Sequence, residues 1–219
     1  MILWVDVESS GLNEKQGHLL EVALVLTDDD LKEVASTSIV MKPVGIEIDD
    51  VKMDDVVREM HTANGLFDEV RKCNVRRHEA EQYLMEFVSS AFKDVPLVPD
   101  KSTCKCGQRK SKHVDTATEE FRHPFDPMLI AAHKQTPFAG STVSFDRAWL
   151  KEHMATLEAM FSYRSIDVSG LTELAQRWAP ETYGFRPKAA GAHRALADVR
   201  ESINYLRFFK WSGFVGGCK

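Results

Sequence analysis

Five residues with the chemistry of a two-metal hydrolase are spread over nearly the whole chain. They are Asp6, Glu8, Asp146, His193 and Asp198. Hard divalent cations such as Mg²⁺ and Mn²⁺ prefer carboxylate oxygens as ligands. Two such cations about 3.5–4 Å apart can clamp the attacking and leaving oxygens of an in-line phosphoryl displacement. The set therefore predicts a site with two divalent cations that hydrolyses a phosphodiester and releases a nucleoside 5'-monophosphate.

The first two carboxylates lie in an apolar segment, ILWVDVESSGL, which has the character of a buried strand. A strand places residues i and i+2 on one face, so Asp6 and Glu8 point together, away from the core that Val5 and Val7 enter. Taken singly, an acid at a strand end is as often a loop cap as a ligand. Asp146 alone could cap the helical pattern that it opens. The joint occurrence of the four carboxylates favours the metal site.

Two further residues are assigned supporting roles. His193 precedes Asp198 by five positions, in a glycine-containing loop that could lean over the site. Histidine exchanges protons near neutral pH, so His193 is the predicted general base for the attacking water. Glu21 is an acid within an otherwise apolar strand, and we expect it to support the site or the fold rather than to bind metal.

The bulk composition predicts one globular domain over residues 1–219, of which 43% are hydrophobic and 28% charged. The net charge of -5 points to a short substrate with few phosphate contacts, because proteins that hold long nucleic acids usually carry a basic excess.

No apolar run reaches the roughly eighteen residues of a membrane span. The short apolar run before Asp6 lacks a basic region, so we expect no signal peptide and a cytoplasmic location. Four cysteines at this length do not make a disulfide framework.

The elements that must position these residues can be outlined from periodicity. Residues 2–7, 19–27 and 34–41 have strand character and short connections, which predicts an antiparallel meander. Helical spacing follows in 54–60, 66–72 and a longer segment from Ala80 to Ala91. After residue 137 the pattern alternates: strand 138–143, helix 146–153, strand 165–167, and helices that begin at Val168 and near Asp198. The order predicts an α/β fold, a mixed sheet flanked by helices.

Residues 94–135 interrupt this pattern and are interpreted as an insertion. Within it, Cys104, Cys106 and His113 could begin a structural Zn²⁺ site, since thiolate and imidazole suit tetrahedral zinc. The fourth ligand could be His123, His133 or Cys73. The alternative is a pair of reduced cysteines in a loop, and the basic first half of the segment is usually solvated charge.

These motifs resemble the DEDD exonuclease superfamily, in its histidine-containing branch with an RNase H-like core. Within it, the chain is most similar to the oligoribonucleases. WVDVESSGL is similar to that family's first motif, MDDVVREMHTANGL and FSYRSIDVSGLTELAQRW resemble two more specific segments, and DVRESI fits the close of the third motif. The resemblance covers roughly residues 1–93 and 137–208. It implies a metal-dependent 3'-to-5' exoribonuclease that acts on short single-stranded RNA as a homodimer.

The resemblance also implies substrate roles. Leu12 resembles the family's leucine wedge between two bases, and His61 its substrate-facing histidine. Tyr163 looks like a tyrosine that reaches the neighbouring subunit's site. Residues Thr142, Arg164 and Ser169 stand where the family caps the 5' phosphate. From the residues alone, Arg164 could bind a phosphate with its guanidinium or form a surface ion pair. Tyr163 could stack on a base or belong to the core.

Some positions depart from the family pattern and keep other functions open. Val56 replaces a tryptophan that offers a stacking surface, and Val143-Ser144-Phe145 before Asp146 is closer to generic proofreading exonucleases. The insertion has no counterpart in the pattern. One alternative is a broader exonuclease on single-stranded DNA or RNA. An alternative of another class is a catalytically silent nucleic-acid-binding or zinc-dependent interaction module, against which the intact acidic set argues.

Overall fold

The computed structural model describes residues 1–92, 136–189 and 191–214. Its centre is a five-stranded sheet in the order β3-β2-β1-β4-β5. The strand bounds are β1 Ile2–Ser9, β2 Leu19–Thr27, β3 Glu33–Val40, β4 Phe138–Gly140 and β5 Ser165–Asp167. The first three strands form an antiparallel meander, while β4 and β5 are parallel to β1. The predicted mixed sheet is confirmed, with β1 at its centre.

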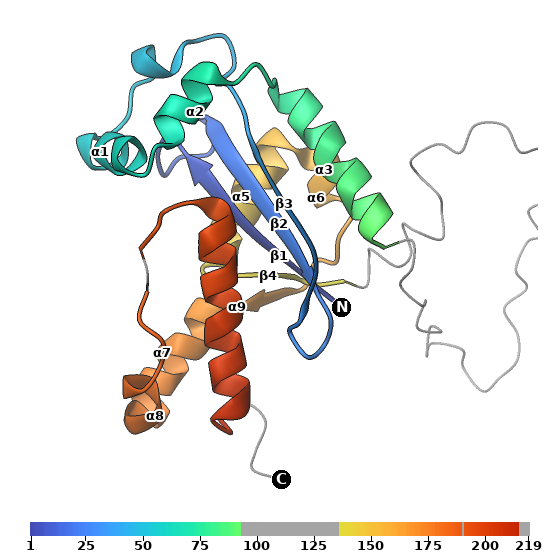
Figure 1. The fold of residues 1–219 in the computed structure, drawn as a ribbon, viewed down its shortest axis with the longest axis vertical. Helices are drawn as coiled ribbons and strands as arrows, with labels where there is room; N and C mark the ends of the chain where they lie inside the picture. Colours follow the sequence, from blue (N-terminus) through green and yellow to red (C-terminus); the bar gives the residue numbers. More distant parts are fainter. Residues whose placement is uncertain (93–135, 190, 215–219) are drawn as a thin grey trace, which may run out of the picture.

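Helices cover both faces of this sheet (Figure 1). On one face, Ala195 and Val199 pack with Trp4 of β1. On the other, Leu84 and Trp149 pack with the neighbouring positions of β1. The helices are α1 Asp55–Ala63, α2 Leu66–Lys72, α3 Arg77–Ala91, α5 Val143–His153, α6 Ala155–Glu158, α7 Val168–Trp178, α8 Pro180–Gly184 and α9 Ala195–Trp211, with a short 3-10 turn at Ile48–Asp50.

Strand β1 explains how acidic residues come to lie in a core strand. Leu3 and Val5 point to the face covered by α3 and α5, and Trp4 points to the face covered by α9. Alternation continues along the strand, so Asp6 and Glu8 follow Trp4 on the α9 side. The two carboxylates therefore lie where β1 leaves the apolar layer beneath α9, in the arrangement expected from their spacing.

The element bounds differ from the predictions most at β4. The expected strand 138–143 ends at Gly140, and α5 begins at Val143. Thr142 has a positive φ of 55°, a backbone conformation that neither a strand nor a helix continues. Asp146 consequently lies in the first turn of α5, not at its N-cap. Short apolar runs do not distinguish a strand from the start of a buried helix, which accounts for the difference.

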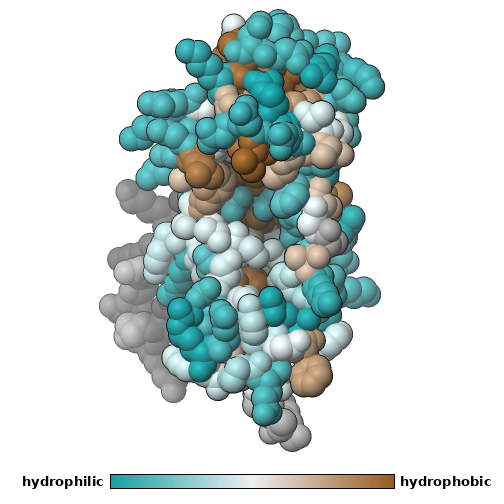
Figure 2. Space-filling model, turned by 90° about the vertical axis from the view of Figure 1, so that its left-hand side faces the viewer, coloured by the Kyte–Doolittle hydropathy of each residue, from teal (hydrophilic) through white to brown (hydrophobic). Residues whose placement is uncertain are grey.

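Several predicted features lie outside the described residues: the insertion 94–135 and its candidate zinc ligands Cys104, Cys106, His113 and His123. Within the described ranges, every helix falls short of the length and apolar character that a bilayer span requires. Figure 2 shows the side that carries α1, α8 and the segment before α9: it is largely hydrophilic, with separate apolar patches. Exposed apolar side chains of these segments include Val56 and Phe185.

Candidate active site

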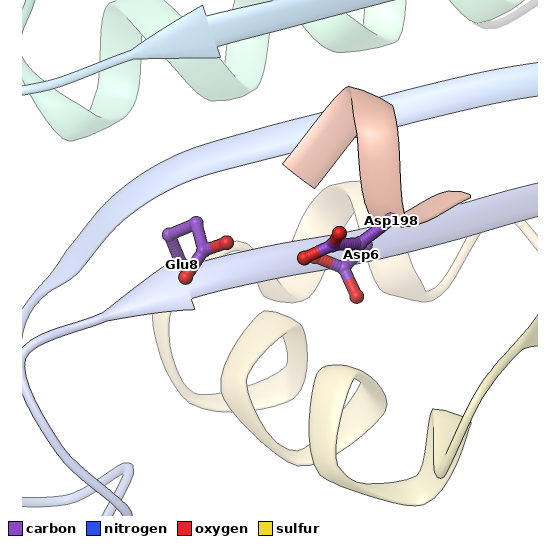
Figure 3. Close-up of side chains that lie close together, drawn as sticks. All are labelled: Asp6, Glu8 and Asp198. Carbon is purple, nitrogen blue, oxygen red and sulfur yellow. The ribbon is translucent and has the colours of Figure 1, made fainter. Parts of the chain in front are cut away.

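Three of the predicted carboxylates converge in the structure. Asp6 and Glu8 come from β1 and Asp198 comes from the first turn of α9 (Figure 3). One oxygen from each of the three lies within 4.8 Å of the others, a spacing that suits a shared cation. The packing of Val199 beside Trp4 brings the start of α9 over β1, and this places Asp198 opposite the two strand residues.

The electrostatics of this cluster favour a bound cation. Burial raises the pKa of Asp6 to about 9, and the negative charges of Asp146, Glu8 and Asp198 add to the effect. Burial, followed by the charge of Asp198, raises the pKa of Glu8 to about 8. The pKa of Asp198 is also raised, chiefly by burial. Carboxyl groups in this state resist ionisation until a positive charge is placed among them.

Asp146 approaches the cluster from the edge of β1, beyond the two residues that pair with β4. It projects from α5, is buried, and accepts a hydrogen bond of 3.0 Å from the backbone N–H of Val7, between Asp6 and Glu8. Burial raises its pKa to about 7, although hydrogen bonds from Val7 and from its own N–H act in the other direction. Asp146 is not among the three residues whose oxygens converge, so its role as a metal ligand stays a prediction.

A cleft of about 270 Å³ opens beside the carboxylates, and Asp6, Asp198 and His193 line it. His193 is exposed and has a positive φ of 47°, a conformation that histidine adopts more readily than most residues. The side-chain amide of Asn64 donates a hydrogen bond to its backbone carbonyl. The loop thus holds an imidazole at the edge of the candidate metal site, where a general base is required.

Arg194 holds this loop and the start of α9 against the sheet. Its Nε donates to the buried carboxylate of Glu21 at 3.0 Å, and its Nη1 donates to Glu69 at 2.7 Å. Glu21 also accepts from the backbone N–H of Ala195 at 3.3 Å. Glu21 pairs with Glu8 across β1 and β2. Sequence reasoning anticipated a supporting role for Glu21 but missed its partner, although an arginine beside the predicted base was a usable signal.

His61 lies in the interior, with no exposed surface. Its Nε2 donates to the backbone carbonyl of Ser9 at 3.0 Å and lies 3.9 Å from a carboxylate oxygen of Glu8. Its Nδ1 is buried without a partner among the described residues, and burial lowers the pKa of the ring. A buried ring behind Glu8 does not favour the expected substrate-facing role, which stays a prediction.

The residues expected near the 5' phosphate are brought together in part. The hydroxyls of Thr142 and Ser169 are 3.1 Å apart, and Asp167 accepts from the backbone N–H of both. Tyr163 and Arg164 are exposed, with the guanidinium carbon 5.7 Å from the ring centroid. These contacts leave the outer faces of the ring and the guanidinium open to a ligand.

Leu12 is 80% exposed, in the segment between β1 and β2. That segment is closed by two hydrogen bonds between Ser10 and His18. A leucine held out in water on such a closed turn is available to contact an apolar surface, such as the face of a nucleobase.

Comparisons with known proteins agree with this geometry. A family model described as "Exonuclease" matches residues 105–206. Among solved structures, the zinc-bound form of Escherichia coli ExoI in complex with single-stranded DNA superposes with a TM-score of 0.63 at 13% identity. The superposition covers 98% of this chain but only 41% of ExoI, so it shows the fold alone.

Curated relatives match over nearly the full chain. The oligoribonuclease of Leifsonia xyli subsp. xyli is 34% identical over 215 residues, which cover 98% of this chain and 84% of the relative. The oligoribonuclease of Corynebacterium glutamicum is 33% identical over 214 residues, which cover 98% and 80%. With the first-motif carboxylates and Asp198 converging in an exonuclease fold, the chain belongs to the oligoribonuclease family.

Proposed function

We propose that this protein is a metal-dependent 3'-to-5' exoribonuclease that hydrolyses short oligoribonucleotides to nucleoside 5'-monophosphates. The observation that carries the proposal is the convergence of Asp6, Glu8 and Asp198 within 4.8 Å. Family membership supports the same activity, because the full-length relatives are oligoribonucleases. The exonuclease family generally uses divalent metal ions, and the protein's substrate is single-stranded nucleic acid.

The donor set fits Mg²⁺ or Mn²⁺. It consists of carboxylate oxygens in a buried setting, without sulfur or imidazole among the converging atoms, and hard cations prefer such ligands. Asp6, Glu8 and Asp198 would hold the metals, together with Asp146 at the edge of β1. Bound there, the metals would supply a polarised water and neutralise the charge that develops on the phosphoryl oxygens.

Residues of the protein would do the remaining work. His193, at the open edge of the cleft, would take the proton from the attacking water. Thr142, Ser169 and Arg164 would hold the 5' phosphate, and a cap of this kind limits substrate length. Leu12 would contact the bases. Tyr163 would contribute across the interface of a homodimer, in which each site uses residues from both subunits.

The proposal is tested by a product-length time course on 5'-labelled RNAs of two to twenty nucleotides with Mg²⁺ and, separately, Mn²⁺. We expect stepwise shortening from the 3' end and fastest turnover of the shortest RNAs. Addition of a chelator should stop the reaction. Internal cleavage, or activity that survives the chelator, would count against an exonuclease with a metal site.

A broader exonuclease on single-stranded DNA and RNA is the second candidate. Its support is Val56, which is 76% exposed where the family pattern has a tryptophan, so a stacking surface that favours short RNA is absent at that position. Matched DNA and RNA oligomers in the same time course separate the two candidates. A catalytically silent binding module would give no product with either substrate.

The remaining assignments complete the proposal. The chain is a single domain with an insertion at 94–135, and its location is cytoplasmic. A structural Zn²⁺ held by Cys104, Cys106, His113 and His123 stays a prediction, because these residues lie outside the described ranges. Metal analysis of the protein after removal of loosely bound ions would test it. One zinc per chain, lost when Cys104 and Cys106 are both replaced by serine, is the expected result.

A further inference from the structure

A basic groove lies outside the site described above. One cavity of about 680 Å³ is lined by Lys42, Arg76 and Arg77 together with neutral residues. A second of about 190 Å³ adjoins it, because Lys42 and Arg77 line both, and it adds Lys15. Neither cavity has an aspartate or glutamate in its lining. In a chain with 33 acidic and 28 basic residues, this concentration of one sign of charge is a distinct local feature.

The described part of the chain offers the cations of the groove no ion-pair partner. Among the described residues, Lys15, Lys42, Arg76 and Arg77 make no ion pair. The acid nearest to Arg76 in sequence, Glu79, accepts a hydrogen bond of 2.7 Å from the backbone N–H of Arg76 and makes no ion pair with its guanidinium. Five other described arginines form ion pairs with carboxylates: Arg71, Arg147, Arg177, Arg194 and Arg200. The cations of the groove differ from these in having no such partner.

The start of α3 adds to the positive potential. Arg76 is its N-cap and Arg77 its first residue, at the positive end of a 15-residue helix. Cations are unfavourable at that end and anions are favourable. The charge of Arg77 also contributes, after burial and His153, to lowering the pKa of His18 in the groove wall. The arrangement carries an electrostatic cost that a bound anion would relieve.

The groove is separate from the residues expected to hold the substrate's 5' phosphate. Thr142 and Ser169 belong to the β4–β5 side of the sheet, whereas Lys42 follows β3 and Arg77 begins α3 on the other side of β1. We propose that the groove formed by Lys15, Lys42, Arg76 and Arg77 is a second, non-catalytic site for phosphate groups. Its ligand is either the backbone of a single-stranded oligoribonucleotide or the phosphate of a free nucleotide. This inference goes beyond the proposed hydrolysis and does not require it.

A hydrogen-bonded path joins the groove to the segment that carries Leu12. Arg77 donates to Nδ1 of His153 at 3.2 Å, and Nε2 of His153 donates to the backbone carbonyl of Glu14 at 2.7 Å. His153 also stacks on Trp149, with ring centroids 5.1 Å apart. A ligand that contacts Arg77 in the groove would therefore act on the segment that carries Leu12, the residue proposed to contact the bases.

The test uses the whole protein in chelator. Without divalent cations hydrolysis stops, so binding is measured on intact RNA, and the difference in affinity between the wild type and the groove variant reports the groove. The variant is Lys42→Gln/Arg76→Gln, because neither side chain makes an ion pair among the described residues and glutamine keeps much of the length of each side chain. The matched control is Lys32→Gln/Lys151→Gln, which removes the same charge from exposed positions outside the groove. Thermal unfolding verifies that both variants are folded, and Lys42→Glu alone serves if the double variant is not.

Two arms distinguish the sources of phosphate. In the first, anisotropy measures binding of a fluorescein-labelled seven-nucleotide RNA over a range of salt. We expect the groove variant to bind roughly tenfold more weakly, and the slope of log affinity against log salt to become shallower by about 1.4, or ~0.7 for each lost contact with a single strand. In the second, calorimetry measures binding of adenosine monophosphate and of inorganic phosphate.

Each outcome decides the inference. A loss confined to the RNA arm supports the site with an RNA strand as its ligand. A loss of monophosphate binding supports it with a nucleotide as its ligand. Equal binding by the wild type, the variant and the control in both arms overturns it. Because Mg²⁺-dependent turnover of a dinucleotide by the wild type is measured separately, failure of the groove and failure of the proposed catalytic activity remain distinguishable.

Discussion

Asp146 differs from the other predicted metal-binding residues in the way it is held. It comes from α5 and is held at the edge of β1 by the backbone N–H of Val7, whereas Asp6 and Glu8 are residues of β1 itself. It nevertheless contributes the largest charge effect among the neighbours that raise the pKa of Asp6. Its charge therefore bears on Asp6 at the candidate metal site, whether or not its own oxygens bind metal.

Asp146→Asn should abolish Mg²⁺-dependent turnover and leave the fold intact. Asparagine keeps an oxygen that can accept from the N–H of Val7 but loses the negative charge. Turnover of a dinucleotide and the thermal unfolding midpoint are the two measurements. Asp68→Asn on the surface of α2 is the matched control and should remain active. An active Asp146→Asn enzyme with Mg²⁺ would show that the residue is not part of the metal site.

His193→Ala should lower kcat by roughly 10²–10⁴-fold while substrate binding is largely kept, as expected for loss of a general base. The residue lines the cleft beside Asp6 and Asp198. Steady-state kinetics across pH provides the check. The rate should fall at low pH where the base becomes protonated, and the variant should lose this contribution to the acid limb of the profile. An acid limb identical to that of the wild type would assign the proton transfer to another group.

At this scale the sequence was informative about residue types and less so about surroundings. The spacing of Asp6 and Glu8 required only that β1 be a strand, and the strand is present. The burial of His61 was not predictable. The sequence of α1 is that of an amphipathic surface helix, and this pattern does not determine whether its histidine faces the core or the solvent. The partners of Arg194 depend on contacts between segments more than a hundred residues apart, which local patterns do not contain.

Among the elements, α9 contributes most to the site, since its first turn supplies Asp198 and the preceding residues supply His193 and Arg194. The element types of β1 and β2 were predictable because each is a largely apolar run with clear ends, whereas β3 shows only partial alternation. The bounds of β4 and α5 were not predictable. The chain changes direction at Thr142 through a positive φ, and a positive φ at a residue other than glycine cannot be recognised from the sequence. The parallel pairing of β4 with β1 rests on few residues and follows from tertiary packing.

Glu21→Gln should loosen the start of α9. The carboxylate of Glu21 is buried and binds both Arg194 and the backbone N–H of Ala195. Breaking a fully buried pair costs about 3–5 kcal/mol, and the cost here should be smaller, about 1–3 kcal/mol, because Arg194 keeps Glu69 and some contact with water. Denaturant unfolding measures this free energy, and kcat should fall with it.

The control for this substitution is Glu69→Gln, which removes the exposed partner of the same arginine. Surface pairs contribute about 0–1 kcal/mol, so this variant should remain close to the wild type in both measurements. If the two variants lose the same unfolding free energy and the same activity, α9 is not positioned by the buried pair.

For the molecule as a whole, the buried carboxylates should make stability depend on pH when metal is removed. The pKa values of Asp6, Glu8 and Asp146 are raised to about 9, 8 and 7 from 3.8, 4.5 and 3.8. The folded protein then binds more protons than the unfolded chain, so stability from these groups is complete below about pH 4 and is lost as pH rises through 7 to 9.

Thermal unfolding in chelator should therefore show a midpoint that falls between pH 5 and pH 9. With Mg²⁺ the fall should be smaller, because the metal binds the ionised carboxylates of the folded state. Asp6→Asn should likewise flatten the dependence in chelator. A midpoint that is constant over this range in the metal-free wild type would contradict the raised pKa values.

The assembly is predicted to be a homodimer in which Tyr163 acts in the neighbouring site. Tyr163 is 84% exposed, and base stacking is worth about 1–3 kcal/mol, a large share of the binding of a dinucleotide. If the ring acts across the interface, mixing inactive Tyr163→Ala and Asp146→Asn subunits should restore part of the activity, since each heterodimer has one site with both residues intact. Activity assays on verified heterodimers test this.

No rescue, or a monomer that is active, would place Tyr163 in its own subunit's site or outside catalysis. The baseline is the activity of the two variant homodimers mixed under conditions in which they do not exchange subunits. Light scattering on the wild type gives the mass of the active species independently of any substitution.

The candidate metal ligands are supplied by β1 and α9, and the ribosome synthesises β1 long before α9. A growing chain that has released β1 from the ribosome carries Asp6 and Glu8 but lacks Asp198 and the arginine that seats α9. Domains fold as units as the chain emerges, at about 5–20 residues per second. The candidate site should therefore stay incomplete until α9 has emerged and packed on β1, so a truncated chain that ends before Asp198 should not hydrolyse RNA.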